Sequence, residues 1–187
     1  MLLPSQTIHS DSRLRPWQTF YSIFFACLAC IFSPFLWALD SDRLQPLEII
    51  ADSVELNEGE GFSNYSGNVL ITQGNMKIEA SQVKVTFNAD GIQTMLAKEG
   101  LRDGLAYMRQ QSEPSADGQN EVMEAWGKSI DYQVNAEYLT LIGNAKLIQQ
   151  GNTFSGYQIL FDIPENNVKA TGGQGKRVNM IFLPKSK

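Results

Sequence analysis

The chain contains an internal repeat, and this repeat limits the folds that it can adopt. Residues 50–87 align with residues 126–163 at an offset of 76 positions, which places Gly67–Asn68 on Gly143–Asn144. Each copy alternates short apolar runs with glycine and asparagine turns, a pattern typical of β-strands. One β unit cannot bury its apolar face alone, so repeated units stack on one another. The repeat therefore predicts an elongated, continuous all-β structure and argues against a compact enzyme.

The N-terminal residues have the pattern of a secretory signal. Two arginines precede the apolar run 20–32, and polar sequence begins just after Ala38. A basic segment, an apolar core and a small residue before a polar start are typical of a signal peptide. We expect cleavage after Ala38 to remove residues 1–38 and to leave residues 39–187 as a single domain. The alternative is an uncleaved anchor, because residues 20–39 approach the ~20 residues that a membrane-spanning helix needs.

Loss of this signal would leave a domain with few reactive side chains. The two cysteines of the chain, Cys27 and Cys30, and its single histidine, His9, all precede Ala38. A disulfide framework, a metal bound by cysteine or histidine, a cysteine nucleophile and a Ser-His dyad are then excluded. We therefore predict no metal site and no cofactor, and no catalytic residue unless paired carboxylates supply one. The formal net charge of −5 argues against a nucleic-acid partner, which requires a basic surface.

Carboxylates are the remaining candidates for catalysis. A glycosidase needs two carboxyl groups about 5–10 Å apart in one cleft. Most of the acids here lie in expected turns or alternate with apolar residues, which predicts that they face solvent. An enzyme acting on envelope glycans would require two of them to face one cleft. The candidates are Asp52, Glu55, Glu58 and Glu60, and Asp131 with Glu137.

Several further strands and loops can be predicted along the chain. The runs 92–97 and 105–109 flank a glycine-containing connection and predict another paired hairpin. Residues 110–121 have the composition of a surface loop between the two repeats. A last strand is expected over 177–183, before Pro184. The short turns predict mostly antiparallel pairing.

Alternation of apolar and polar residues predicts one continuous apolar interior. Its expected members are Leu47, Ile49, Val54, Leu56, Val69, Ile71, Ile78, Val83, Val85, Tyr107, Ile130, Tyr132, Leu139, Leu141, Leu147, Phe154, Ile159 and Phe161. Two interpretations remain open. The interior is an ordinary sandwich core, or it opens along one side and receives an apolar ligand. Burial of about ten methylenes of an acyl chain would contribute ~8 kcal/mol before ordering costs.

Four segments together resemble a known family. They are Pro46–Ile49, Gly67–Gly74, Leu141–Leu147 and Gly175–Val178. In order, spacing and duplication they are similar to the LptA family, also called OstA-like, of periplasmic lipopolysaccharide transport proteins, over nearly all of the predicted mature chain. The resemblance implies an all-β open antiparallel β-jellyroll, V-shaped and built from two similar halves. It also implies that the acyl chains of lipid A lie between the two sheets.

The resemblance and the alternation together predict two sets of site residues. The expected lipid contacts are Leu47, Ile49, Val69, Ile71, Tyr107, Tyr132, Val134 and Leu141. The expected contacts between copies lie in the last strand, at Arg177, Val178, Met180 and Phe182.

The resemblance also implies location, partners and a function without catalysis. We expect a periplasmic carrier that binds lipopolysaccharide and associates with itself head to tail. It would link an inner-membrane anchored β-jellyroll partner to the periplasmic domain of an outer-membrane translocon. Two alternatives remain: the membrane-anchored partner of the same fold, and a structural scaffold of the bridge that does not bind lipid directly.

Overall fold

The computed structural model describes residues 45–101, 103–111, 121–173, 175 and 177–184. Every described residue belongs to one compact unit of the chain. The predicted signal and most of the predicted loop 110–121 lie outside the described residues. Among the described residues, no helix has the length and apolarity needed to cross a membrane.

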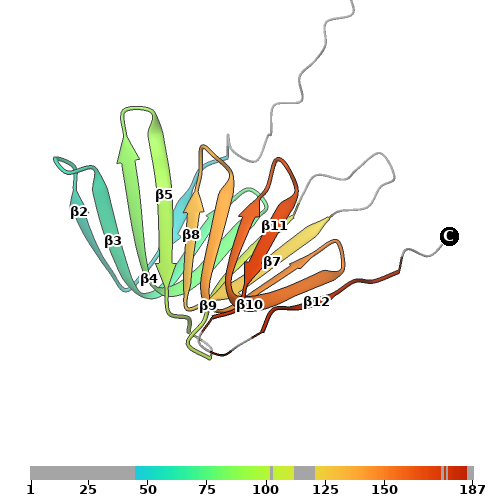
Figure 1. Ribbon diagram of the computed structural model, residues 1–187. Coiled ribbons are helices and arrows are strands. Elements are labelled where there is room, and N and C mark those ends of the chain that lie inside the picture. Colours follow the sequence, from blue (N-terminus) through green and yellow to red (C-terminus); the bar gives the residue numbers. More distant parts are fainter. Residues whose placement is uncertain (1–44, 102, 112–120, 174, 176, 185–187) are drawn as a thin grey trace, which may run out of the picture. The chain divides into compact units, whose positions relative to one another are not determined.

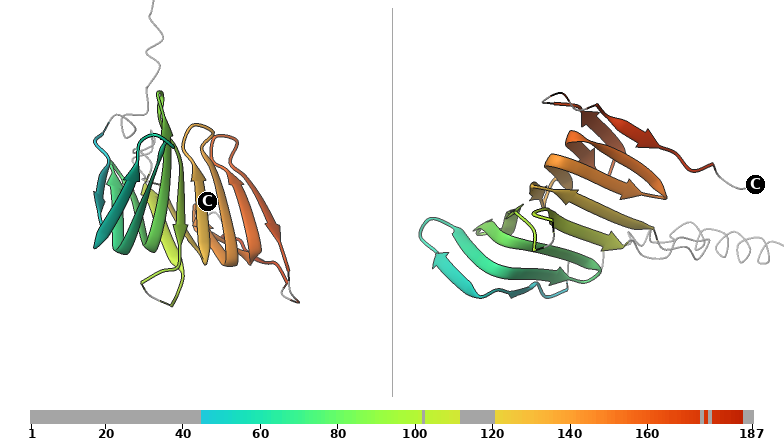
Figure 2. Two further views of the ribbon diagram at one scale, coloured as in Figure 1. Left: turned by 90° about the vertical axis from the view of Figure 1, so that its left-hand side faces the viewer. Right: turned by 90° about the horizontal axis from the view of Figure 1, so that it is seen from below.

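The described residues form twelve antiparallel strands joined in one sheet (Figure 1). The strands are β1 (Glu48–Ile50), β2 (Ser53–Asn57), β3 (Phe62–Gln73), β4 (Met76–Asn88), β5 (Gly91–Lys98), β6 (Ala106–Gln111), β7 (Val122–Gly127), β8 (Ser129–Gln133), β9 (Tyr138–Gln149), β10 (Asn152–Asp162), β11 (Asn167–Thr171) and β12 (Asn179–Ile181). Their order in space follows their order in sequence from one end of the unit to the other, as the colours in Figure 2 show. This arrangement confirms the predicted all-β fold built from stacked units.

The sheet is folded into two layers because its four long strands contribute to both. Layer A runs β2-β3-β4-β5-β8-β9-β10-β11, through the first parts of β3 and β9 and the last parts of β4 and β10. Layer B runs β1-β3-β4-β6-β7-β9-β10-β12, through the remaining parts of the same four strands. The unit is therefore an open jellyroll. Each layer has an inner face, turned toward the other layer, and an outer face.

A β-bulge marks the line where each pair of long strands passes from one layer to the other. The pairing of β3 with β4 shifts between Ser66 and Val69, where Gly67 and Asn68 have φ angles of 76° and 47°. Bulges increase the bend and twist of a strand, which suits them to this fold line. The backbone N–H of Asp52 donates to the carbonyl of Gly67 at 2.9 Å, and the Asn68 amide donates to the Asp52 carboxylate at 2.8 Å.

The two halves of the unit repeat this geometry at the predicted offset of 76 residues. Gly143 and Asn144 have φ angles of 78° and 53°, and the Lys128 N–H donates to the Gly143 carbonyl at 2.8 Å. Strands β1 to β6 thus correspond to β7 to β12. The last two pairs deviate slightly in offset: Met108 of β6 corresponds to Met180 of β12, because they oppose the equivalent residues Ile78 and Phe154.

The predicted hairpin between residues 92–97 and 105–109 is wrong. Strand β5 pairs with β4 and β8 in layer A, whereas β6 pairs with β4 and β7 in layer B. The connection between them therefore carries the chain from one layer to the other. Gly100 allows this passage, since a Cβ atom there would lie 1.5 Å from the Leu105 carbonyl oxygen.

Candidate functional site

The inner faces of the two layers enclose a continuous apolar interior. In layer B, cross-strand neighbours form an unbroken apolar ladder, which we call the layer B ladder: Ile49, Ile71, Ile78, Met108, Ala125, Leu147, Phe154 and Met180. Directly opposed residues on one face are the pairs through which a sheet is stabilised. The ladder runs from β1 to β12, so the apolar surface extends over the full length of the sheet.

Layer A carries two further ladders of inward-facing residues, which are apolar except for the buried Ser63. One, the outer layer A ladder, contains Leu56, Ser63, Val85, Met95, Tyr132, Leu139, Phe161 and Val168. The other, the inner layer A ladder, contains Val54, Tyr65, Val83, Ala97, Ile130, Leu141, Ile159 and Ala170. Residues in the middle of all three ladders are almost completely buried, and exposure rises only toward the strands at each end.

Seven of the eight predicted lipid contacts lie on this interior. Val69, Ile71, Tyr132 and Leu141 are buried in the core. The other three, Leu47, Ile49 and Val134, are partly buried and pack against the core. The structure therefore brings these seven residues together on one surface, four of them inside the packed part and three at its margins.

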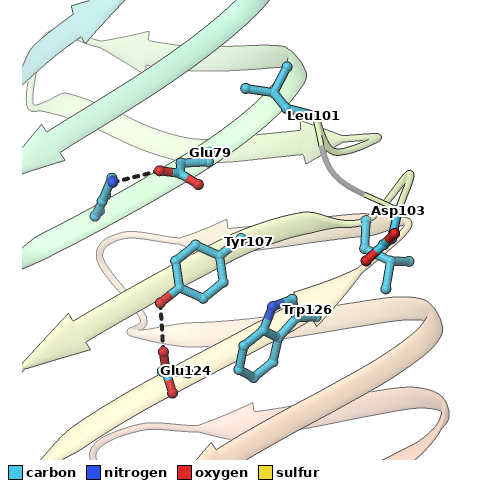
Figure 3. A pocket seen from close by; sticks show the side chains of 8 residues that line it. Glu79, Leu101, Asp103, Tyr107, Glu124 and Trp126 are labelled. Carbon is cyan, nitrogen blue, oxygen red and sulfur yellow. Dashed lines mark hydrogen bonds and ion pairs between the residues drawn. The ribbon is translucent and has the colours of Figure 1, made fainter.

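Tyr107, the eighth predicted contact, lies on the outer face of layer B (Figure 3). Its hydroxyl donates to a Glu124 carboxylate oxygen at 2.7 Å, and its ring lies 5.3 Å from that of Trp126. The Lys146 ammonium lies 4.8 Å from the centre of the Trp126 ring, in cation–π geometry. Burial and the acceptor Glu124 raise the pKa of Tyr107 to about 12. Tyr107 is therefore separated from the other predicted contacts by the thickness of the sheet.

The large interior-facing side chain of β6 is Met108, and sequence reasoning missed it. Met108 is fully buried, as are its neighbours in the layer B ladder, Ile78 and Ala125. The signal was available in the alternation, since Ala106 and Met108 flank Tyr107 and share one face. The prediction instead took the large aromatic side chain of Tyr107 to face the interior.

In the second half, the two layers approach each other closely at their free margin, which is the edge of the layers away from the bulges of the fold line. There the Gln149 amide of layer B donates to the Asn166 side-chain oxygen of layer A at 2.6 Å. Next to this contact is a pocket of about 230 Å³ lined by Met123, Phe161 and Ile163, among others. This volume is below the ~300–1,000 Å³ of typical ligand sites. An acyl chain would therefore need the layers to separate further at this margin.

The predicted carboxylate candidates do not lie in the interior. Asp52, Glu55, Glu58 and Glu60 are exposed on β2 and its flanking turns. Asp131 is half-buried on the outer face of β8, where burial raises the pKa of its carboxyl group. Among the described residues, no three His, Cys, Asp or Glu side chains are grouped so that they could hold a metal ion.

The predicted contacts between copies lie at the free end of layer B. Met180 is in β12, Arg177 and Val178 precede this strand, and Phe182 follows it. All four are exposed. Phe182 packs edge-to-face on Phe154, with 6.0 Å between ring centres. The opposite free end, at β1 and β2, likewise exposes Ile50, Val54 and Leu56.

Comparison with known proteins connects this architecture to a family. Residues 48–167 match the family described as LptA/(LptD N-terminal domain) LPS transport protein. The chain is 35% identical to the lipopolysaccharide export system protein LptH of Pseudomonas aeruginosa over 172 residues, 88% of this chain and 94% of that protein. It is 27% identical to the lipopolysaccharide export system protein LptA of Escherichia coli K12, over 79% of this chain and 76% of that protein.

A solved structure has the same fold. The crystal structure of LptH, described as the LptA-homologous periplasmic component of the lipopolysaccharide transport device of P. aeruginosa, superposes with a TM-score of 0.64. The superposition covers 77% of this chain and 99% of the LptH chain, at 33% sequence identity.

Proposed function

The chain belongs to the family of LptA and LptD N-terminal domain lipopolysaccharide transport proteins, and we propose that it carries lipopolysaccharide across the periplasm. The observation that supports this most is the apolar interior, which extends without interruption from β1 and β2 to β11 and β12. A ligand held between layers A and B could move along this surface and keep its acyl chains in an apolar environment. The sugar part would remain in water outside the margin.

The acyl chains of lipid A are proposed to enter at the free margin of the two layers. Leu47, Ile49 and Val134 are the first contacts, because they are partly buried and accessible without rearrangement of the core. Val69, Ile71, Tyr132 and Leu141 become contacts as the layers separate. Each methylene that leaves water contributes ~0.8 kcal/mol, so an acyl chain of about ten methylenes could offset the opening of the margin. Tyr107 faces away from this path and is assigned no part in it.

The proposed role is non-enzymatic and is that of a bridge. The chain would receive lipopolysaccharide from an inner-membrane anchored β-jellyroll partner and pass it to the periplasmic domain of an outer-membrane translocon. Copies of the chain would associate head to tail through their free sheet ends, with Arg177, Val178, Met180 and Phe182 at one end. Residues 1–38 would direct the chain to the periplasm and be removed there.

A scaffold that joins the two membranes without binding lipid is the second candidate. Exposed apolar residues at both free ends of the sheet favour strand addition, whatever the interior holds. The uncleaved, membrane-anchored partner of the same fold is a third, and the mass of the protein recovered from the periplasm distinguishes it from a cleaved carrier.

Photo-crosslinking in cells separates a carrier from a scaffold. A photoreactive amino acid is placed at Val134, which faces the interior, or at its neighbour Gln133, which is exposed on the outer face. Both positions lie in the middle of the unit, away from its ends. A lipopolysaccharide adduct from position 134 and not from 133 supports the carrier. Absence of an adduct from position 134 in a folded, secreted protein would contradict it and favour the scaffold.

A further inference from the structure

The inner face of layer B has a row of amide and thioether side chains at its free margin. Cross-strand neighbours in this row, which we call the margin row, are Gln73, Met76, Gln110, Met123, Gln149 and Asn152. Each lies two residues along its strand from a member of the layer B ladder, a distance of about 7 Å, and shares its face. A ligand that enters between the layers therefore passes the margin row before it reaches the ladder.

Gln110 differs from the other two glutamines of this row in the state of its polar group. Its side-chain oxygen Oε1 is buried, and no donor among the described residues bonds it. The other two glutamines make hydrogen bonds: the Gln73 amide donates to the Gln45 carbonyl at 3.1 Å, and the Gln149 amide donates to Asn166 at 2.6 Å. The buried acceptor without a partner is therefore a property of Gln110 and not of the row.

The side chains beside Gln110 cannot supply the missing hydrogen bond. Gln110 lies between Met76 of β4 and Met123 of β7, and Met108 precedes it on the same face of β6. These three methionines are buried, and a thioether sulfur is a weak acceptor that donates no hydrogen bond. An unpaired acceptor in such surroundings costs free energy, which an apolar side chain of the same shape would not. A donor from outside the chain would remove this cost.

The pocket at the free margin of the second half gives such a donor access to Gln110. Gln110 lines this pocket of about 230 Å³, and Phe161 and Ile163 line it from the side of layer A. Among the described residues that line it, the charged one is Glu121, an acid. A phosphate group would therefore meet a like charge in this pocket and no cation. A neutral donor carried by an apolar chain fits these surroundings better.

A hydroxyl on an acyl chain suits the position of this acceptor better than an amide N–H at the head of the chain. The oxygen of Gln110 is buried, so its donor has to come inside the margin together with the apolar chain. A hydroxyl on the first few carbons of the chain would lie there while the rest of the chain reaches the layer B ladder. A hydroxyl can also accept a hydrogen bond from the Gln110 amide nitrogen, which an N–H cannot.

Resting on the proposed function, we propose that Gln110 determines specificity within the lipid path. Its side-chain oxygen accepts a hydrogen bond from a hydroxyl near the head end of an acyl chain, and this bond selects hydroxylated acyl chains over plain ones. Burial of the methylenes on the layer B ladder favours both kinds of chain equally. A site with a buried acceptor discriminates against an analogue that lacks the donor, because the acceptor is then left unpaired.

Three matched acyl probes test this selectivity. Methyl dodecanoate, methyl β-hydroxydodecanoate and N-methyl dodecanamide are uncharged and share one chain length. They carry no donor, a hydroxyl on the chain and an N–H at the head, respectively. Their affinities for the protein recovered from the periplasm are measured by displacement of a fluorescent fatty acid. We expect the hydroxy ester to bind about three- to tenfold more tightly than the plain ester, and more tightly than the amide.

Gln110→Met is the matched variant, since methionine is unbranched and of similar length but has no strong acceptor. In this variant the hydroxy ester should bind no more tightly than the plain ester, because its hydroxyl loses water without gaining a partner. Gln73→Met is the control from the same row and should keep the preference of the parent protein. Without ligand, Gln110→Met should raise the urea concentration at the unfolding midpoint. A purely structural role would lower this midpoint and leave the preference intact.

Failure of this inference and failure of the carrier function give different results. Equal binding of the two esters by the parent protein would mean that water alone bonds the Gln110 oxygen and would overturn the inference. A preference that survives in Gln110→Met, or tighter binding of the amide, would also overturn it. In all these cases the probes bind, so the carrier function stands. Binding of no probe, with no lipopolysaccharide adduct from position 134, would contradict the carrier function and this inference with it.

Discussion

Adjacent residues on one strand have opposite environments in this fold, and Leu141 and Ile142 of β9 show the contrast. Leu141 is fully buried between the layers, whereas Ile142 is exposed on the outer face. Truncation of a buried leucine to alanine removes its packing and leaves a cavity, at a cost of about 2–5 kcal/mol. We expect Leu141→Ala to lower the free energy of unfolding by this amount in urea titrations. Ile142→Ala is the control and should cost about 1 kcal/mol or less; equal effects would contradict the assigned faces.

The tyrosine on the outer face should make stability depend on alkaline pH. The folded pKa of Tyr107 is about 12, above the ordinary tyrosine value of 10.0, because the neutral phenol is partly buried and donates to Glu124. A raised pKa contributes stability that is fully present below the unfolded pKa and is lost as pH rises through the folded pKa. The urea concentration at the unfolding midpoint should therefore decrease as the pH is raised from about 10 to about 12.

Tyr107→Phe is the matched variant for this pH effect. It keeps the ring beside Trp126 but removes the group that ionises. The fall of the urea midpoint over the same pH range should be smaller in this variant than in the parent protein. An identical pH dependence in both proteins would show that another group is responsible.

At the scale of the element, the bulges on the fold line determine where a long strand leaves one layer for the other. Gly67 has a positive φ, and a Cβ atom there would lie 2.2 Å from a carboxylate oxygen of Asp52. Gly67→Ala should therefore cost the left-handed backbone strain of about 1–2 kcal/mol and also displace the Asp52 contact. Gly104→Ala should cost only the backbone strain, because Gly104 has a positive φ but no atom would lie within 4 Å of the added Cβ atom. We expect a larger loss of thermal stability for Gly67→Ala, and equal losses would contradict the close contact.

Much of this element-scale structure can be predicted from the sequence, because it depends on local patterns. The offset of 76 places Gly67–Asn68 and Gly143–Asn144 at equivalent bulges, and alternation identifies the interior faces of β3, β4, β9 and β10. The passage from β5 to β6 could not be predicted. A glycine-containing connection is common to hairpins and to crossings between layers, and only the close approach of Gly100 to Leu105 distinguishes them.

The candidate site was predicted less completely than the fold. Alternation placed six of the expected lipid contacts on the interior and the resemblance added Val134, but the phase of β6 was taken from Tyr107 and not from Met108. The degree to which each of these side chains is buried could not be predicted either, because it depends on neighbours that are distant in sequence. Val54 and Ile130 occupy equivalent positions of the repeat, yet only Ile130 has a strand on each side, β5 and β9.

At the scale of the whole molecule, the two halves should behave as one folding unit. Ile71 and Leu147 are equivalent in the repeat, fully buried, and members of the same layer B ladder. The pairing of β5 with β8 in layer A and of β6 with β7 in layer B connects the halves through buried residues, so neither half can unfold without exposing the other. A domain of this size with one continuous core is expected to unfold in a single cooperative transition.

A destabilising substitution in either half should therefore lower the midpoint of the same single unfolding transition. Ile71→Ala and Leu147→Ala each remove a buried aliphatic side chain, which costs about 2–5 kcal/mol. In urea, followed by circular dichroism and by tryptophan fluorescence, each variant should show one transition with a lowered midpoint and an unchanged slope. In protein prepared without residues 1–38, which contain Trp17 and Trp37, the fluorescence comes from Trp126 in β7 of the second half, so it should also shift when Ile71 in the first half is changed. A Trp126 transition that stays in place in Ile71→Ala while the circular dichroism splits into two steps would mean that the halves are independent domains.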